Sequence, residues 1–168
     1  MAANAILRPS AGFMLAHPAH LIALGFGTGL SPIAPGTLGT LLGFPIYWLA
    51  SSVLGGDGPF AMLALIAAMF VLGVWACART GRDLGVTDHS GMNWDEIVAF
   101  QFVLLLTPDP WQWQAFAFFG FRFFDVVKPP PIRQVDARMQ GGLGVMFDDI
   151  LAAFYTLLAM AIYKAFLG

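Results

Sequence analysis

Five long apolar segments alternate with short polar stretches along the chain. The clearest covers residues 60–78, FAMLALIAAMFVLGVWACA, and contains no charged residue in 19 positions. As an α-helix at about 1.5 Å per residue it would be roughly 28 Å long, close to the thickness of the hydrocarbon core of a bilayer. This segment is therefore predicted to span a membrane.

Four further segments are apolar and close to the length of a helix. They cover residues 37–53, 94–106, 111–127 and 150–166. The second and fourth of these are short for a full crossing, so we expect some of the segments to be tilted, re-entrant or buried behind their neighbours. Five tryptophans lie near segment ends, where indole rings favour the membrane interface. The pattern predicts an all-α fold, a small polytopic membrane helix bundle of about four to five apolar helices, in one domain over residues 1–168.

Composition favours the same class of protein. The chain is 58% hydrophobic and 11% charged, with a mean hydropathy of +0.75, above the range of ordinary soluble domains. The net charge of −2 argues against nucleic acid as a partner. The single cysteine, Cys77, cannot form a disulfide within the chain, and its apolar neighbours are typical of a packed thiol. The bilayer is the partner that the composition predicts.

The charged residues are unevenly distributed. Residues 122–149 hold eight of the eighteen charged side chains. Because Lys and Arg in short loops stay in the cytoplasm, an N-terminus placed inside predicts that seven of the eight basic residues lie on the cytoplasmic side. These seven are Arg8, Arg79, Arg82, Arg122, Lys128, Arg133 and Arg138. Lys164, Asp57 and Asp109 then fall toward the opposite side, and the polar loops gather at the cytoplasmic face.

Carboxylates are concentrated in two of these polar loops. The first loop holds Asp83, Asp88, Asp95 and Glu96, and the second ends in the pair Asp148 and Asp149. Near a helix start, carboxylates can simply complement the helix dipole. Six of them gathered at one face would repel one another unless cations neutralised them, and oxygen ligands favour a hard ion. The sequence therefore predicts a Mg²⁺ site rather than a zinc site.

Groups suited to an anion accompany the carboxylates. The stretch 25–40, GFGTGLSPIAPGTLGT, can present backbone N–H groups and hydroxyls at a helix start, although its glycine spacing fits no nucleotide-binding loop. Arg122 and Asp125 stand at i and i+3 in an aromatic segment, where charge at membrane depth usually marks function. Lys128 follows, just before three prolines. Cations facing a carboxylate-rich centre suit phosphoryl chemistry.

Three ordered motifs carry a resemblance to a known family. They are GTGLSPIAPGTLGT, the 83–96 stretch ending in WDE, and FRFFDVVKPPPIR followed by GGLGVMFDD. With these motifs the chain resembles the phosphatidylglycerophosphatase A family over about residues 20–153. The resemblance implies a Mg²⁺-dependent lipid phosphatase of the bacterial inner membrane, which converts phosphatidylglycerophosphate to phosphatidylglycerol. One departure is visible, because Ala152 and Ala153 follow the Asp pair where the family often has Ala-Gly.

The resemblance and the residues together suggest roles for individual side chains. The candidate metal ligands are Asp83, Asp88, Asp95, Glu96, Asp148 and Asp149. The candidates for the catalytic base that accepts a proton from water are Asp95, Glu96 and Asp149. The candidate phosphate-binding residues are Thr28, Thr37, Arg122 and Lys128. The sequence leaves open which carboxylate is the base, whether one or two ions bind, and the oligomeric state.

Two other classes of protein compete with this interpretation. A CDP-alcohol phosphatidyltransferase shares Gly144-x-x-x-Asp148 and Asp136-Ala-Arg138 with this chain, but the Asp-Gly-x-x-Ala-Arg core is absent. No Asp occurs four residues after Asp148 either. A non-enzymatic membrane protein or transporter would explain the helices, but it would not explain polar motifs gathered at one face.

Overall fold

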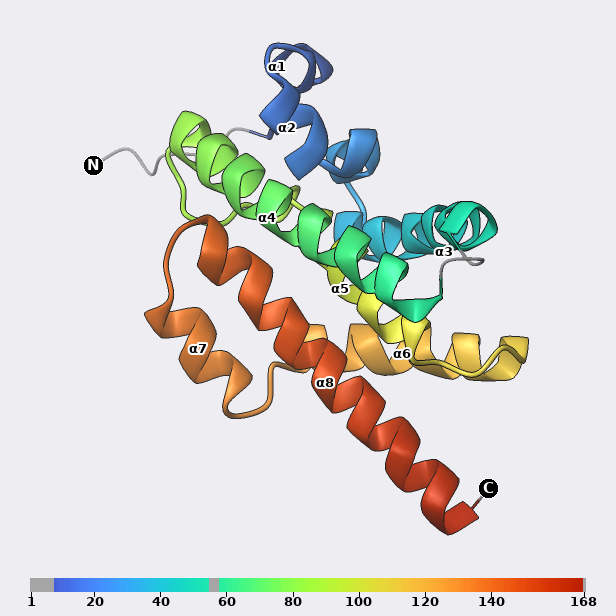
Figure 1. Ribbon diagram of the computed structural model, residues 1–168. Helices are drawn as coiled ribbons and strands as arrows, with labels where there is room; N and C mark the ends of the chain where they lie inside the picture. Colours follow the sequence, from blue (N-terminus) through green and yellow to red (C-terminus); the bar gives the residue numbers. More distant parts are fainter. Residues whose placement is uncertain (1–7, 55–57, 168) are drawn as a thin grey trace.

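The computed structural model describes residues 8–54 and 58–167, and within these ranges the regular structure is entirely helical (Figure 1). Three short elements come first: α1 (Ala11–Leu15), α2 (Pro18–Ala23) and the 3-10 helix η1 (Gly25–Leu30). The remaining helices are α3 (Pro35–Leu54), α4 (Pro59–Leu84), α5 (Trp94–Leu105), α6 (Trp111–Val127), α7 (Ile132–Arg138) and α8 (Gly142–Leu167). The predicted all-α fold is confirmed. Asp57 lies outside the described residues.

Helices long enough and apolar enough to cross a membrane form much of the bundle. Among the described residues there are three of them: α3, α4 and α8. Their outer faces carry large apolar side chains, such as Val71 at 69% exposed and Phe154 at 54% exposed. A soluble protein rarely leaves so much apolar surface open to solvent. These helices make the protein membrane-associated.

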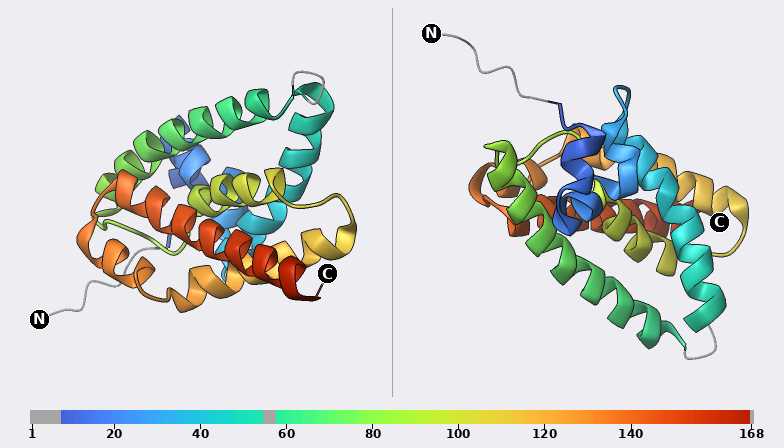
Figure 2. Two further views of the ribbon diagram at one scale, coloured as in Figure 1. Left: turned by 60° about the horizontal axis from the view of Figure 1, so that its bottom comes forward. Right: turned by 90° about the horizontal axis from the view of Figure 1, so that it is seen from above.

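The short helix α5 occupies the interior of the bundle. Figures 1 and 2 show it surrounded by α3, α4, α6 and α8, all of which it contacts. Ile97, Val98 and Phe100 on this helix are fully buried. Of the arrangements expected for a short segment, 94–106 therefore adopts the one buried behind its neighbours.

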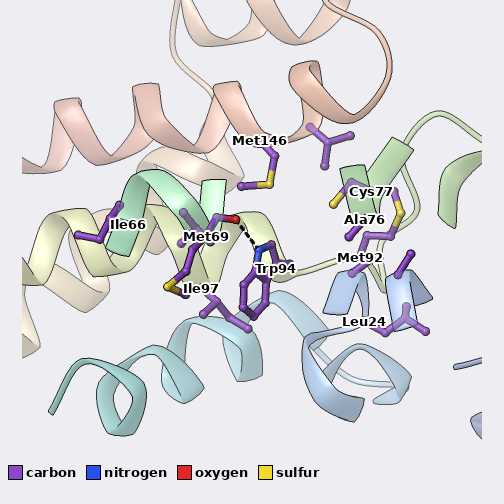
Figure 3. Close-up of a cluster of buried hydrophobic side chains, with 13 residues drawn as sticks. Leu24, Ile66, Met69, Ala76, Cys77, Met92, Trp94, Ile97 and Met146 are labelled. Atoms are coloured by element: carbon purple, nitrogen blue, oxygen red, sulfur yellow. Dashed lines mark hydrogen bonds between the residues drawn. The ribbon is translucent and has the colours of Figure 1, made fainter. Parts of the chain in front are cut away.

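One tryptophan lies in the core rather than at an interface. Trp94 is 5% exposed and packs among the buried side chains of Figure 3, including Met69 of α4 and Met146 of α8. Its indole Nε1 donates a hydrogen bond to the Met69 carbonyl oxygen at 3.1 Å. The expectation of an interfacial indole is wrong for Trp94, because its single polar group finds a partner inside the bundle.

The last helix begins earlier than the apolar pattern predicts. The apolar pattern predicts a helix over 150–166, whereas α8 begins at Gly142. A Cβ at Gly142 would collide with the backbone of α4 at Val74 and Ala78. The glycine therefore allows α8 to approach α4 closely, and this packing offsets its low helix propensity.

Candidate active site

A polar pocket of about 260 Å³ lies where several helices begin or end. Helices α3 and α5 begin at the pocket, α6 ends there, and α8 contributes its second turn. Its charged lining residues in the described part of the chain are Asp88, Asp95, Glu96, Arg122, Asp125, Lys128, Asp148 and Asp149. Residues from three separate sequence motifs therefore meet at one end of the bundle.

The glycine-rich loop is fastened to the start of α5. The fully buried Asn93 donates hydrogen bonds from Nδ2 to the Pro35 carbonyl oxygen at 2.7 Å and to Thr28 Oγ1 at 2.9 Å. A Cβ on Gly36 would collide with the Glu96 carboxylate, so glycine lets α3 begin directly against α5. The sequence reasoning missed Asn93, although its position just before WDE could have marked it as a helix-start residue.

Two acidic side chains of α5 are buried in the pocket wall. Asp95 is 7% exposed, and its Oδ1 accepts a hydrogen bond from the Glu96 backbone N–H at 3.0 Å. Burial, followed by the charges of Glu96 and Asp88, raises the pKa of Asp95 well above its usual range. Burial and the neighbouring Asp125 raise the pKa of Glu96 to about 8. Both carboxyl groups thus lie where negative charge is costly without a cation.

Arg122 joins α6 to α5 across the pocket. Its Nη1 donates to Asp125 Oδ2 at 2.6 Å, as the i, i+3 spacing predicts, and also to Glu96 Oε1 at 3.1 Å. Its side chain is only 18% exposed. The expected pair of Arg122 and Asp125 within α6 is thus connected to Glu96 on α5. Asp125 therefore belongs to the site as well.

Lys128 enters the pocket from a strained turn at the end of α6. The residue has a left-handed backbone, with φ 45° and ψ 64°, and the three prolines that follow prevent the helix from continuing. Its Nζ donates to Asp148 Oδ2 on α8. A non-glycine residue in this conformation costs roughly 1–2 kcal/mol, and such strain is typical of functional sites.

The Asp pair lies inside α8 and not at its start. We expected Asp148 and Asp149 to precede or cap the last helix, and this is wrong because α8 begins six residues earlier, at Gly142. Both side chains are buried, at 4% and 3% exposed. Neither Asp149 Oδ2 nor Glu96 Oε2 has a hydrogen-bond partner among the described residues. Buried carboxylate oxygens without a donor are rare and usually mark a functional site.

Three predicted site residues lie outside this pocket. Thr28 donates its hydroxyl to the Gly25 carbonyl oxygen and contacts Asn93, and Thr37 does not line the pocket. Asp83 accepts hydrogen bonds from His20 Nε2 at 2.9 Å and from Arg79 Nε at 2.8 Å, so it ties α2 to α4. The structure thus gives Asp83 and Thr28 contacts that hold the fold around the site.

His89 also lines the pocket. Its Nδ1 accepts a hydrogen bond from the Gly91 backbone N–H at 2.9 Å. This bond closes the turn that leads into α5, so His89 shapes the pocket wall.

The pocket provides the donor chemistry that a hard cation requires. In the described part of the chain, no three His, Cys, Asp or Glu side chains are already arranged around one metal position. Mg²⁺ does not require such a cage, because it usually keeps several waters and binds one or two carboxylates together with substrate phosphates. The unpartnered oxygens of Glu96 and Asp149 fit this mode of binding.

The fold and the pocket define a helical membrane protein with a site at one end of its apolar helices, lined by carboxylates and by the basic side chains of Arg122 and Lys128. Such a site is expected of an enzyme that acts on a charged lipid headgroup. The family model described as phosphatidylglycerophosphatase A matches residues 21–164. The chain belongs to the phosphatidylglycerophosphatase A family. No solved structure matches it.

Three relatives with assigned names are similar in sequence to this chain over most of their length. The chain is 44% identical to phosphatidylglycerophosphatase A of Haemophilus influenzae, over 87% of this chain and 88% of the relative. It is 41% identical to phosphatidylglycerophosphatase A of Escherichia coli, over 82% of this chain and 78% of the relative. A Bacteroides thetaiotaomicron protein, whose name provisionally assigns it phosphatidylinositol-3-phosphatase activity, is 41% identical over 88% of this chain and 94% of the relative.

Proposed function

We propose that this protein hydrolyses the terminal phosphomonoester of phosphatidylglycerophosphate, giving phosphatidylglycerol and inorganic phosphate. The observation that carries the proposal is the pocket, which places Arg122 and Lys128 against buried carboxylates at one end of a bundle of apolar helices. A lipid whose acyl chains remain in the bilayer can present its headgroup to such a pocket. Family membership and the names of the relatives support this substrate.

The charge of the pocket supports a metal cofactor. Of the described lining residues, six carry carboxyl groups and only two are basic, so a phosphate dianion would meet more acidic than basic side chains unless further cations bind. The starts of α3 and α5 add only partial positive charge. We propose that Asp95, Glu96, Asp148 and Asp149 hold Mg²⁺, with Asp88 at the pocket mouth. An ion held there would supply positive charge to offset that of the phosphate and would make the attacking water more acidic.

The side chains of the protein bind the phosphate and accept the proton of the attacking water. Arg122 and Lys128 bind phosphate oxygens and offset the charge that builds up during transfer. One buried carboxylate accepts the proton of the attacking water, and Asp95, Glu96 and Asp149 are the candidates for this base. The alcohol leaves as the glycerol hydroxyl of the lipid product. The glycine-rich loop, held by Asn93, keeps α3 against this site.

Phosphate release from a panel of lipids tests the proposed substrate. We expect the purified protein to hydrolyse phosphatidylglycerophosphate in mixed micelles faster than phosphatidylinositol 3-phosphate or phosphatidic acid, and to leave CDP-diacylglycerol intact. The phosphatidylinositol lipid is included because one relative is named for it. A preference for that lipid would replace the proposed substrate, and incorporation of an alcohol into CDP-diacylglycerol would favour the transferase alternative.

Removal of divalent metal is expected to abolish phosphate release. The reason is the excess of carboxylates in the pocket, which leaves the substrate phosphate without enough neutralising charge. The measurement is the rate after exhaustive chelation and after stepwise addition of Mg²⁺, with Zn²⁺ and Ca²⁺ as matched controls. Full activity in the chelated protein would contradict the metal site.

The pocket is proposed to face the cytoplasm of a multi-pass protein in the bacterial inner membrane, because the basic residues favour that side. In a Cys77→Ala background, Thr87→Cys and Gln134→Cys should resist an impermeant thiol reagent applied to spheroplasts, while Asp109→Cys should react. Labelling of the first two sites with protection of the third would reverse the orientation. Permeabilised cells, in which all three sites should react, provide the control.

A further inference from the structure

A second, apolar cavity lies between α3 and α6. This groove has a volume of about 560 Å³ and lies between two facing sets of side chains. Its lining residues are Leu41, Phe44, Pro45 and Trp48 of α3 with Trp111, Gln114, Ala115, Phe118 and Phe119 of α6. Apart from the Gln114 amide and the indole N–H groups of Trp48 and Trp111, these described lining side chains are apolar. The groove therefore suits a hydrocarbon ligand and offers almost nothing to a polar one.

The groove and the polar pocket lie along the same two helices, α3 and α6. Gly36 of α3 and Arg122 of α6 line the pocket and lie against each other, since a Cβ on Gly36 would stand 3.1 Å from Arg122 Nη1. One to two helical turns further along the same two helices, Phe44 and Phe118 bring their rings to a centroid separation of 6.1 Å at the groove. At about 1.5 Å per residue, Leu41 lies only about 8 Å from Gly36 along α3.

From this continuity we propose that the groove binds an acyl chain of the same lipid whose phosphate occupies the polar pocket. The inference rests on the proposed function, because it assigns the two ends of one substrate to two adjoining sites. Headgroup and acyl chain are joined covalently, so a polar pocket leading into an apolar groove matches the chemistry of a membrane lipid. Seating the chain fixes the depth at which the headgroup reaches Arg122.

A filled groove should weaken catalysis on lipids and spare catalysis on the headgroup alone. Ala115→Trp places a large ring in the groove, about one turn of helix from its far end at Trp111. We expect kcat/KM for long-chain phosphatidylglycerophosphate to fall about tenfold, in the range typical of a blocked hydrophobic subsite. For the water-soluble headgroup, from which both acyl chains have been removed, kcat/KM should change by less than about twofold.

The matched control is Val71→Trp, which adds the same ring to an exposed apolar position on α4. It should leave both rates unchanged. Equal losses on both substrates in Ala115→Trp would overturn the inference, because they would show a distorted site or a disturbed contact between copies of the chain. Unchanged rates on both would overturn it too. Failure of the wild-type protein on both substrates would instead contradict the proposed function, so the two failures are distinguishable.

Discussion

Asp149→Asn is expected to lower the turnover of phosphatidylglycerophosphate about a hundredfold or more, which corresponds to roughly 2.7 kcal/mol of transition-state stabilisation. Asp149 is buried in the second turn of α8, faces the pocket, and has a carboxylate oxygen without a hydrogen-bond partner in the described structure. Asn has the same shape but lacks the negative charge that a metal ligand or catalytic base requires.

Stability separates this role from a structural one. Asp149 shares the pocket with Asp95 and Glu96, so removing its charge relieves repulsion between like charges. The variant should therefore unfold in detergent at the wild-type temperature or above it while losing activity. Asp109→Asn, at an exposed position, is the matched control and should retain normal turnover. Near-normal turnover in Asp149→Asn would remove this residue from the catalytic machinery.

Arg122→Lys is expected to reduce kcat/KM on the same lipid about tenfold to a hundredfold, or roughly 1.4–2.7 kcal/mol. Lysine keeps the charge but loses the planar fork with which arginine contacts several oxygens at once. In the structure that fork contacts Glu96 on α5 and Asp125 on α6. Retaining a cation is important, because a neutral residue would leave two partly buried carboxylates, those of Glu96 and Asp125, without this positive partner and destabilise the fold.

The control for this substitution is Arg79→Lys. Arg79 also pairs with an aspartate, Asp83, but its side chain is 45% exposed and lies outside the pocket. Exposed ion pairs contribute little, so Arg79→Lys should behave as wild type in both stability and rate. If Arg122→Lys also retained the wild-type rate, the bond from Arg122 would be structural and the substrate phosphate would be bound elsewhere.

Local patterns in the sequence predicted much of the fold. The charge-free run 60–78 lies within α4, and the aromatic run 111–127 coincides with α6. Segment 94–106 is too short to cross a bilayer, which made a buried position one of the arrangements expected for it, and α5 is the interior helix. Each of these features depends on length and hydropathy, which a single segment carries by itself.

What the sequence did not predict depends on contacts between distant segments. The apolar run 150–166 gives no sign that α8 begins at Gly142, because the close approach of α4 that makes glycine suitable there is a tertiary contact. Asp83 lies close in sequence to the other acidic residues, which suggested that it belongs to the site. In the structure its carboxylate instead contacts His20, which is 63 residues away in the sequence. Likewise Arg122 already had a partner in Asp125 at i, i+3, so nothing local indicated its second contact with Glu96.

The most direct test of the account is to follow the phosphorus atoms of phosphatidylglycerophosphate by ³¹P NMR during turnover by the purified protein with Mg²⁺. The account predicts that the phosphomonoester signal disappears, that inorganic phosphate grows in equal amount, and that the phosphodiester signal persists as phosphatidylglycerol. The Asp149→Asn variant should leave all signals unchanged on the same timescale. Cleavage of the phosphodiester, or a phosphomonoester that persists in the presence of folded wild-type protein, would contradict the assignment of this pocket as a lipid phosphomonoesterase site.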